Sequence, residues 1–170
     1  MTSPPPATGP LAGIRIPAGP LAGIRIIDIT TIFLGPYATQ MLGDMGADVI
    51  KIEAPPRGDS TRWLGRARHP GMGGSFLNLN RNKRSLALDL KQDTARDALR
   101  RLIATSDVMV HNMRAAAIER LGFGYHEVPA IKPDTVYFAA QGHGPARPSR
   151  HRPASADPLP VARRPSKPSA

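Results

Sequence analysis

The chain has 170 residues, a formal charge of +10 and 41% hydrophobic residues, which suits one soluble domain with its own core. It contains no cysteine, which excludes a disulfide framework, a thiolate zinc site and a cysteine nucleophile. No apolar run reaches the roughly 20 residues of a transmembrane helix, and the start lacks the regions of a secretory signal. We therefore expect a cytoplasmic protein without a membrane partner.

The positive charge raises nucleic acid as a partner, because clustered cations bind phosphates. Many of these cations, however, lie near the end of the chain among prolines, with no aromatic residue for base stacking: Arg147, Arg150, Arg152, Arg163, Arg164 and Lys167. We expect no specific nucleic-acid partner. The five histidines show no metal-ligand spacing, so we expect no metal site.

A direct repeat opens the chain, since GPLAGIRI at residues 9–16 recurs at residues 19–26. Two short copies cannot form a solenoid, which needs at least three longer units. The second copy continues into Ile27, Asp28 and Ile29, a β-branched run that predicts the first strand. Residues 1–18 are therefore predicted to be a leader.

A helix is predicted to start at Gly35 and Pro36 and to stop at Gly46. Its apolar residues fall on one face, namely Tyr37, Ala38, Met41, Leu42 and Met45. Next we predict a strand at residues 49–52, a loop over 54–74 and a strand at 86–88. Asp93 is predicted to cap a second helix, whose apolar face holds Ala95, Ala98, Leu99, Leu102 and Ile103.

Further strands are predicted at residues 108–110 and 136–140, and Pro129 should shorten a helix expected over 125–132. Apolar strands that alternate with amphipathic helices predict an α/β fold, a Rossmann-like doubly wound parallel sheet. Residues 19–141 form this partial domain, and its sheet is expected to be incomplete. The proline- and arginine-rich residues 142–170 are predicted to be a disordered tail. Ligands of such sheets bind beyond the carboxyl ends of the strands.

Neither common phosphate-loop motif is present. Ordered phrases instead occur along the chain: GPYAT at residues 35–39, LGDMGADVIKIE at 42–53, GDSTR at 58–62, LNRNKRS at 79–85, LDLK at 88–91, DVMVHN at 107–112 and ERLGFGY at 119–125. Over residues 21–144 the chain resembles the N-terminal portion of the class III CoA-transferases. This family includes the formyl-CoA, carnitine and bile-acid CoA-transferases and the 2-methylacyl-CoA racemases.

The resemblance implies a coenzyme A site, with coenzyme A or acyl-CoA as substrate and no bound prosthetic group. It places the contacts at Ile32, Phe33, Leu88, Asp89, Leu90, Lys91, Asn112, Met113 and Arg120. Cations suit the phosphates of coenzyme A, and apolar residues suit its long pantetheine arm. One departure is Ala54, where the family commonly has an arginine. The implied partners are an acyl-CoA, a carboxylic acid and a second subunit, although so short a chain is not expected to form the family's interlocked homodimer.

In this family an aspartate attacks the acyl-CoA thioester and carries the coenzyme as an aspartyl-CoA intermediate. That position falls beyond Ala170, so no catalytic residue is assigned and the chain is expected to be truncated and inactive alone. The sequence after about Gly144 could also be a frame-shifted translation. Three alternatives stay open: a racemase fragment, a non-catalytic basic module that binds coenzyme A or nucleic acid, and a pseudogene product.

Overall fold

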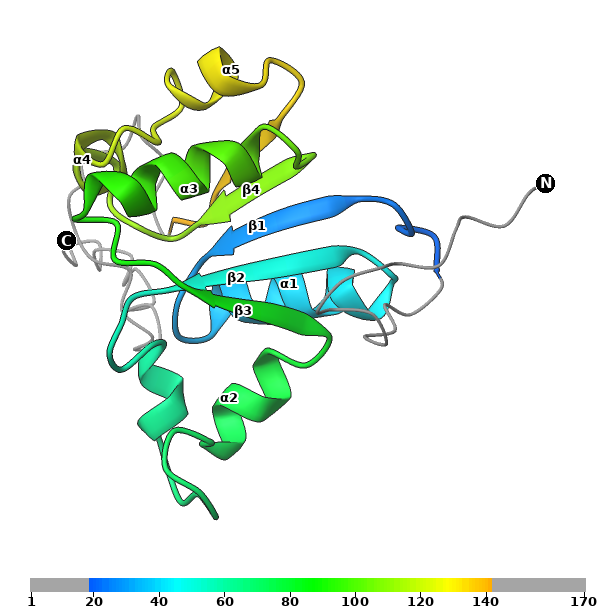
Figure 1. Cartoon of the computed structure of the whole chain (residues 1–170). Coiled ribbons are helices and arrows are strands. Elements are labelled where there is room, and N and C mark those ends of the chain that lie inside the picture. Colours follow the sequence, from blue (N-terminus) through cyan, green and yellow to red (C-terminus); the bar gives the residue numbers. More distant parts are fainter. Residues whose placement is uncertain (1–18, 142–170) are drawn as a thin grey trace, which may run out of the picture. The chain divides into compact units, whose positions relative to one another are not determined.

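The computed structural model describes residues 19–141, and these form a five-stranded sheet in which all neighbouring strands are parallel (Figure 1). The strands, in the order β3-β2-β1-β4-β5 across the sheet, are β3 (Lys83–Ala87), β2 (Asp48–Glu53), β1 (Arg25–Ile29), β4 (Val108–His111) and β5 (Val136–Ala139). The chain first moves outward from β1 to β3 and then returns to add β4 and β5 on the other side. The predicted doubly wound α/β fold is confirmed, with its switch point between β1 and β4.

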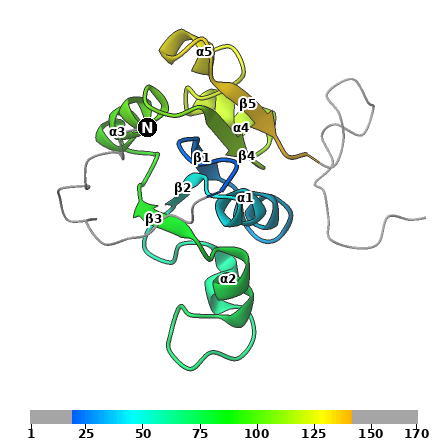
Figure 2. The same ribbon diagram turned by 90° about the vertical axis from the view of Figure 1, so that its right-hand side faces the viewer.

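Helices cover both faces of this sheet, and Figure 2 shows α1 (Leu34–Asp44) and α3 (Asp93–Ile103) on opposite sides. The shorter helices are α2 (Gly74–Leu79), α4 (Ala115–Arg120) and α5 (Val128–Ile131). The larger core lies on the α3 side and contains Ile27, Ile29, Ile50, Ile52, Leu99, Ile103, Met109, Ile118, Phe123 and Val128. A smaller core on the other face contains Ile26, Ala47, Val49 and Val110.

The predicted apolar face of α3 is confirmed, because Leu99 and Ile103 are fully buried and Leu102 packs against the same core. The predicted cap is wrong. Asp93 is the first residue of the helix, and Gln92 occupies the cap position without a side-chain hydrogen bond. The Asp93 carboxylate instead accepts a hydrogen bond from Arg96 on the same helix, and it still lies in the first turn, where an acid favours the helix dipole.

The apolar face predicted for α1 is not the face that the helix buries. Tyr37, Met41 and Met45 are 53%, 43% and 44% exposed. The buried residues of the helix are small or polar, namely Gly35, Pro36, Thr39, Gln40 and Gly43. The reason is what α1 faces: the Thr39 hydroxyl donates a hydrogen bond of 2.6 Å to Asp28 on β1. The predicted end of the helix is correct, because Gly46 follows α1 with a φ of +99°.

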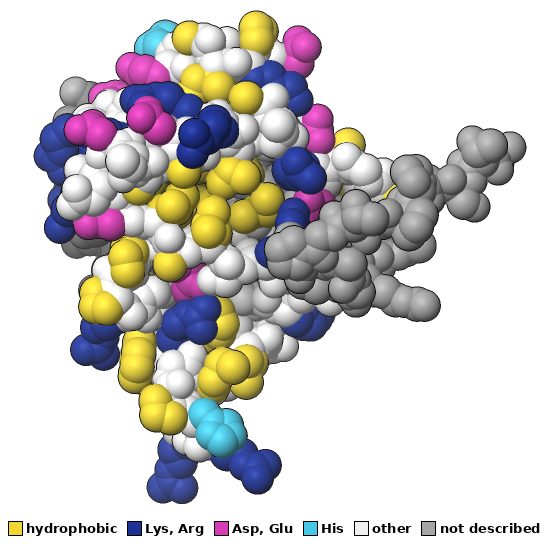
Figure 3. All heavy atoms as spheres, viewed as in Figure 1, with side chains coloured by type: hydrophobic (Ala, Val, Ile, Leu, Met, Phe, Trp, Pro, Cys, Tyr) yellow, Lys and Arg dark blue, Asp and Glu magenta, His cyan; other side chains and the backbone are white. Residues whose placement is uncertain are grey.

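The region predicted as a loop over residues 54–74 is more ordered than expected. It contains a 3-10 helix, η1 (Ser60–Trp63), whose first turn is capped by Asp59, and it leads into the unpredicted α2. Exposed hydrophobic side chains lie here among Lys and Arg side chains, as the lower part of Figure 3 shows; they include Trp63, Leu64, Met72 and Leu77.

The position of β3 also differs from the prediction, because the strand starts at Lys83 and ends at Ala87 rather than covering residues 86–88. Lys83 pairs with Val49 and Ala87 with Glu53, so the pairing includes polar residues that the hydrophobic pattern did not mark. The shortened helix at Pro129 is confirmed as α5, which has only four residues. No helix in residues 19–141 has the length and apolar character needed to span a membrane. The predictions for residues 1–18 and 142–170 lie outside the described residues.

Candidate functional site

A cavity of about 540 Å³ lies at the carboxyl ends of the strands, where parallel sheets bind their ligands. Its walls come from the residues that end or follow β1, β2 and β3, and from the region around α4. The lining residues are Ile29, Thr31, Ile52, Ala54, Leu88, Asp89, Leu90, Lys91, Met113, Ala117, Arg120 and Leu121. We call this cavity the strand-end pocket.

Six of the nine contacts implied by the resemblance line the strand-end pocket: Leu88, Asp89, Leu90, Lys91, Met113 and Arg120. The other three, Ile32, Phe33 and Asn112, do not. Ile32 and Phe33 are 47% and 42% exposed in the loop after β1. Asn112 reaches the pocket wall indirectly, since it exchanges two hydrogen bonds with the backbone of Thr31. The structure thus brings distant segments together, while the role of each residue as a coenzyme contact stays a prediction.

Several lining residues were absent from the predicted set. Ile29 and Ile52 could have been added, because they lie at the ends of strands that the sequence predicted. Thr31 could have been found in the same way, two residues beyond β1. Leu121 lies within the phrase ERLGFGY at residues 119–125, so the family resemblance could have pointed to it. Ala117 lies in α4, which hydrophobic periodicity did not reveal, so no sequence signal pointed to Ala117.

The charges at the pocket favour an anionic ligand. Among residues 19–141, neither the Lys91 ammonium nor the Arg120 guanidinium forms an ion pair with a carboxylate, so both are available to phosphate oxygens. Asp89 is the single carboxylate of the lining. It accepts a hydrogen bond of 3.1 Å from the Lys91 backbone N–H, which shapes the turn after β3. The remaining wall is mostly apolar, as a pantetheine arm requires.

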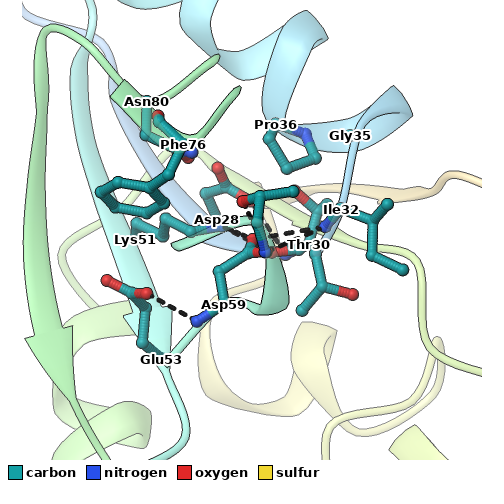
Figure 4. Close-up of polar contacts among 12 residues, drawn as sticks. Asp28, Thr30, Ile32, Gly35, Pro36, Lys51, Glu53, Asp59, Phe76 and Asn80 are labelled. Carbon is teal, nitrogen blue, oxygen red and sulfur yellow. Dashed lines mark hydrogen bonds and ion pairs between the residues drawn. The ribbon is translucent and has the colours of Figure 1, made fainter. Parts of the chain in front are cut away.

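Four charged side chains, here called the buried charge cluster, lie on the α1 side of the sheet: Asp28, Lys51, Asp59 and Lys83 (Figure 4 labels the first three). Lys51 Nζ lies 3.0 Å from Asp59 Oδ2, and Lys83 Nζ lies 3.0 Å from Asp28 Oδ2. All four side chains are at most 1% exposed, so each pair must neutralise itself. Register could have revealed part of the cluster, because Asp28 on β1 lies directly opposite Lys51 on β2.

Burial and the attraction between the charges act on the pKa values of this cluster in opposite directions. It lowers the pKa of Lys83 to about 8, even though the attraction of Asp28 acts in the opposite direction. Burial alone would raise the pKa of Asp28, but attraction to Lys83 and Lys51 outweighs it and leaves the pKa below its usual value. The stable state at neutral pH therefore has Asp28 charged against lysine.

A third ion pair joins Glu53 at the end of β2 to Arg62 in η1. Arg62 donates two hydrogen bonds to the Glu53 carboxylate, at 2.8 and 2.6 Å, and the Asp59 backbone N–H donates another at 2.9 Å. Burial raises the pKa of Glu53, but the bonds from Arg62 and Ser85 outweigh it and lower the pKa to about 2. This pair fixes the chain beside Ala54, a pocket residue.

Comparison with known proteins agrees with this geometry. The sequence profile of CoA-transferase family III matches residues 21–163, most of the chain. The chain belongs to this family. The match extends past residue 141 into the segment that the sequence predicted to be a separate tail, and the domain boundary there stays a prediction.

Curated relatives in the family include succinyl-CoA:glutarate CoA-transferase of Mus musculus, which is 39% identical over 84% of this chain and 30% of its own length. Acetyl-CoA:oxalate CoA-transferase of Acetobacter aceti is 38% identical over 90% of this chain and 36% of its own length. Among solved structures, a CAIB/BAIF family protein from Brucella suis has a TM-score of 0.76 and 34% identity, covering 81% of this chain and 37% of that protein. The chain spans about a third of the length of the curated relatives it matches.

In this family member a side-chain contact also joins His111, the last residue of β4, to Tyr137 of β5. Tyr137 Oη lies 2.7 Å from His111 Nε2. Burial lowers the pKa of His111, against a smaller opposite effect of a backbone hydrogen bond at Met113, and burial with Glu119 and Glu127 raises the pKa of Tyr137 to about 12. Both groups are therefore neutral at pH 7 and fix the backbone that leads into Met113.

Proposed function

We propose that this chain supplies the coenzyme A-binding part of a class III CoA-transferase, which moves coenzyme A between carboxylic acids. The observation that carries the proposal is the strand-end pocket, where two cations without carboxylate partners among residues 19–141, Lys91 and Arg120, border an apolar wall. Family membership gives the ligand its identity, because acyl-CoA is the substrate that CoA-transferases share. The relatives named above are transferases, which favours transfer over racemisation.

In this proposal Lys91 and Arg120 bind the phosphates of coenzyme A, while Leu88, Leu90 and Met113 contact its pantetheine arm. Coenzyme A is then a substrate, and no prosthetic group is invoked. We propose no nucleophile among the described residues, since Asp89 already shapes the turn after β3. The aspartyl-CoA intermediate, the homodimer, the cytoplasmic location and the identity of the two acids stay predictions.

Calorimetry with coenzyme A and the full 170-residue chain tests the proposed site. Arg120→Ala should raise the Kd by about one to two decades, because a hydrogen bond to a charged group contributes roughly 1.5–3 kcal/mol. Arg101→Ala is the matched control, since Arg101 is exposed on α3 and lies outside the pocket lining. Ala54→Arg should lower the Kd, because Ala54 lines the pocket and a third cation would reach the phosphates. A wild-type chain that does not bind coenzyme A, or equal losses in both Arg→Ala variants, would contradict the proposal.

A further inference from the structure

The loop between β1 and α1 has an unfavourable backbone conformation. Ile32 has a φ of +72°, in the left-handed region, and is β-branched. Side chains of this type clash there with their own backbone, at a cost of roughly 1–2 kcal/mol. Such a conformation persists only where the surrounding structure enforces it, and these positions concentrate at ligand sites.

Three side chains from other parts of the chain enforce it through the backbone. The Ile32 N–H donates to both carboxylate oxygens of Asp59, each at 3.3 Å. Lys51 Nζ donates to the Thr30 carbonyl at 2.8 Å. Asn112 accepts from the Thr31 N–H at 3.0 Å and donates to the Thr31 carbonyl at 2.9 Å. Figure 4 shows Asp59 and Lys51 converging on this loop from one side.

Asp59 is the central member of this arrangement and has no capacity left for a ligand. Its carboxylate also accepts from the Thr61 backbone N–H at 2.9 Å and from the Thr61 hydroxyl at 2.8 Å. Its ion pair with Lys51 completes the set, and the residue is only 2% exposed. It does not line the pocket, whereas Thr31, next to Ile32, does. Asp59 can therefore affect a bound molecule only through the loop.

We propose that Asp59 is a positioning residue of the coenzyme site, which holds the strained loop 30–32 so that Thr31 forms its part of the pocket wall. This inference rests on the proposed function. The buried ion pair with Lys51 holds the Asp59 carboxylate in place. The ion pair between Arg62 and Glu53 holds the segment that contains Asp59. The loop is thus shaped before a ligand arrives, which limits the ordering cost of binding.

The test compares two Asp→Asn variants, one at Asp59 before η1 and one at Asp48 at the start of β2. Asp59→Asn removes the carboxylate that faces Ile32, and Asp48→Asn removes the acid that pairs with Arg25 and Arg84 at the opposite end of β2. Both should lower the melting temperature. Only Asp59→Asn should raise the Kd for coenzyme A, by about tenfold if the loop then holds its binding shape a tenth of the time. An unchanged Kd in folded Asp59→Asn, or equal increases in both variants, would overturn the role of Asp59.

Two further measurements keep the test decisive. If Asp59→Asn does not fold, Thr61→Val removes one hydrogen bond to Asp59 at nearly constant volume and should raise the Kd by about threefold; no rise would overturn the proposal. Amide hydrogen exchange of Ile32, measured without ligand, should become faster in the variants that weaken this contact but not in Asp48→Asn. A wild-type chain with a protected Ile32 amide that binds no coenzyme A would instead contradict the proposed function, which separates the two failures.

Discussion

Helices α1 and α3 both have 11 residues and both lie against the same sheet, yet they bury opposite kinds of side chain. Helix α3 places Leu99 and Ile103 in the larger core. Helix α1 instead places glycine, proline, threonine and glutamine against the strands and leaves Tyr37 and Met41 exposed. The difference follows from the surfaces they face, because α3 covers a purely apolar core whereas α1 covers the buried charge cluster as well.

The comparison shows when hydrophobic periodicity identifies the buried face of a helix. It does so when the opposing surface is apolar, as on the α3 side, where β1 and β2 contribute isoleucines and β4 contributes Met109. It fails when the opposing surface offers a charge that needs a hydroxyl partner, as Asp28 needs Thr39. Close approach of the backbone then requires small residues, so Tyr37 and Met41 turn outward, while Leu42 packs against the smaller core.

Among substitutions on the α1 side of the sheet, loss of the Asp28 carboxylate should destabilise the fold most. Asp28→Asn leaves Lys83 buried without its counter-ion, which should lower the free energy of unfolding by about 3–5 kcal/mol. Urea unfolding at pH 7 measures the change. Asp97→Asn is the matched control on α3, because Asp97 and its partner Arg100 are largely exposed, and its effect should stay within about 0.5 kcal/mol. Equal effects of the two substitutions would contradict the account of the cluster.

A smaller effect should distinguish the two sides of α1 itself. A Cβ at Gly35 would lie 2.3 Å from the Cβ of buried Thr30, so Gly35→Ala forces the helix away from β1. Overpacking costs about 1–3 kcal/mol, and the better helix propensity of alanine recovers part of it, so a net loss of about 1–2 kcal/mol is expected. Met41→Ala removes a much larger group from the exposed side and should change stability by about 0.5 kcal/mol or less. Thermal unfolding of both variants tests this, and a larger loss for Met41→Ala would reverse our assignment of the buried face.

Much of this fold could be predicted from the sequence, because most strands and the α3 face depend on local apolar patterns. The family phrases also located six pocket residues. What could not be predicted depends on pairing between distant segments. The start of β3 is polar and is a strand only because Lys83 lies beside Val49. Asp59 follows a glycine in an apparent loop, and its role depends on Lys51 and Ile32, which only the folded chain brings to it.

The last expected effect depends on acid pH, and it also distinguishes the two sides of the sheet. Glu53 lies on the same face of β2 as Lys51, since residues two apart in a strand share a face. Its pKa is about 2 in the folded state against an ordinary value of 4.5. A group whose folded pKa is lowered stabilises the fold fully above its unfolded pKa, and this stability is lost as the pH falls through the folded pKa. The stabilisation that Glu53 contributes on the α1 side should therefore decrease as the pH falls from about 4.5 to 2. The contribution of the apolar α3 core to the free energy of unfolding should not depend on pH in this range.

The difference between wild type and Glu53→Gln isolates this contribution from the other acids. The full pKa difference corresponds to roughly 3 kcal/mol, and solvent contact of the partly exposed Arg62 reduces the expected value to about 1–2 kcal/mol. Denaturant unfolding between pH 2 and pH 6 should show wild type more stable than Glu53→Gln above pH 4.5, with the two curves converging as the pH approaches 2. Leu99→Ala is the control from the other side, because it should lower stability by about 2–5 kcal/mol at every pH in this range. A gap between wild type and Glu53→Gln that stays constant down to pH 2 would mean that the Glu53 carboxylate is not held in its charged form by Arg62.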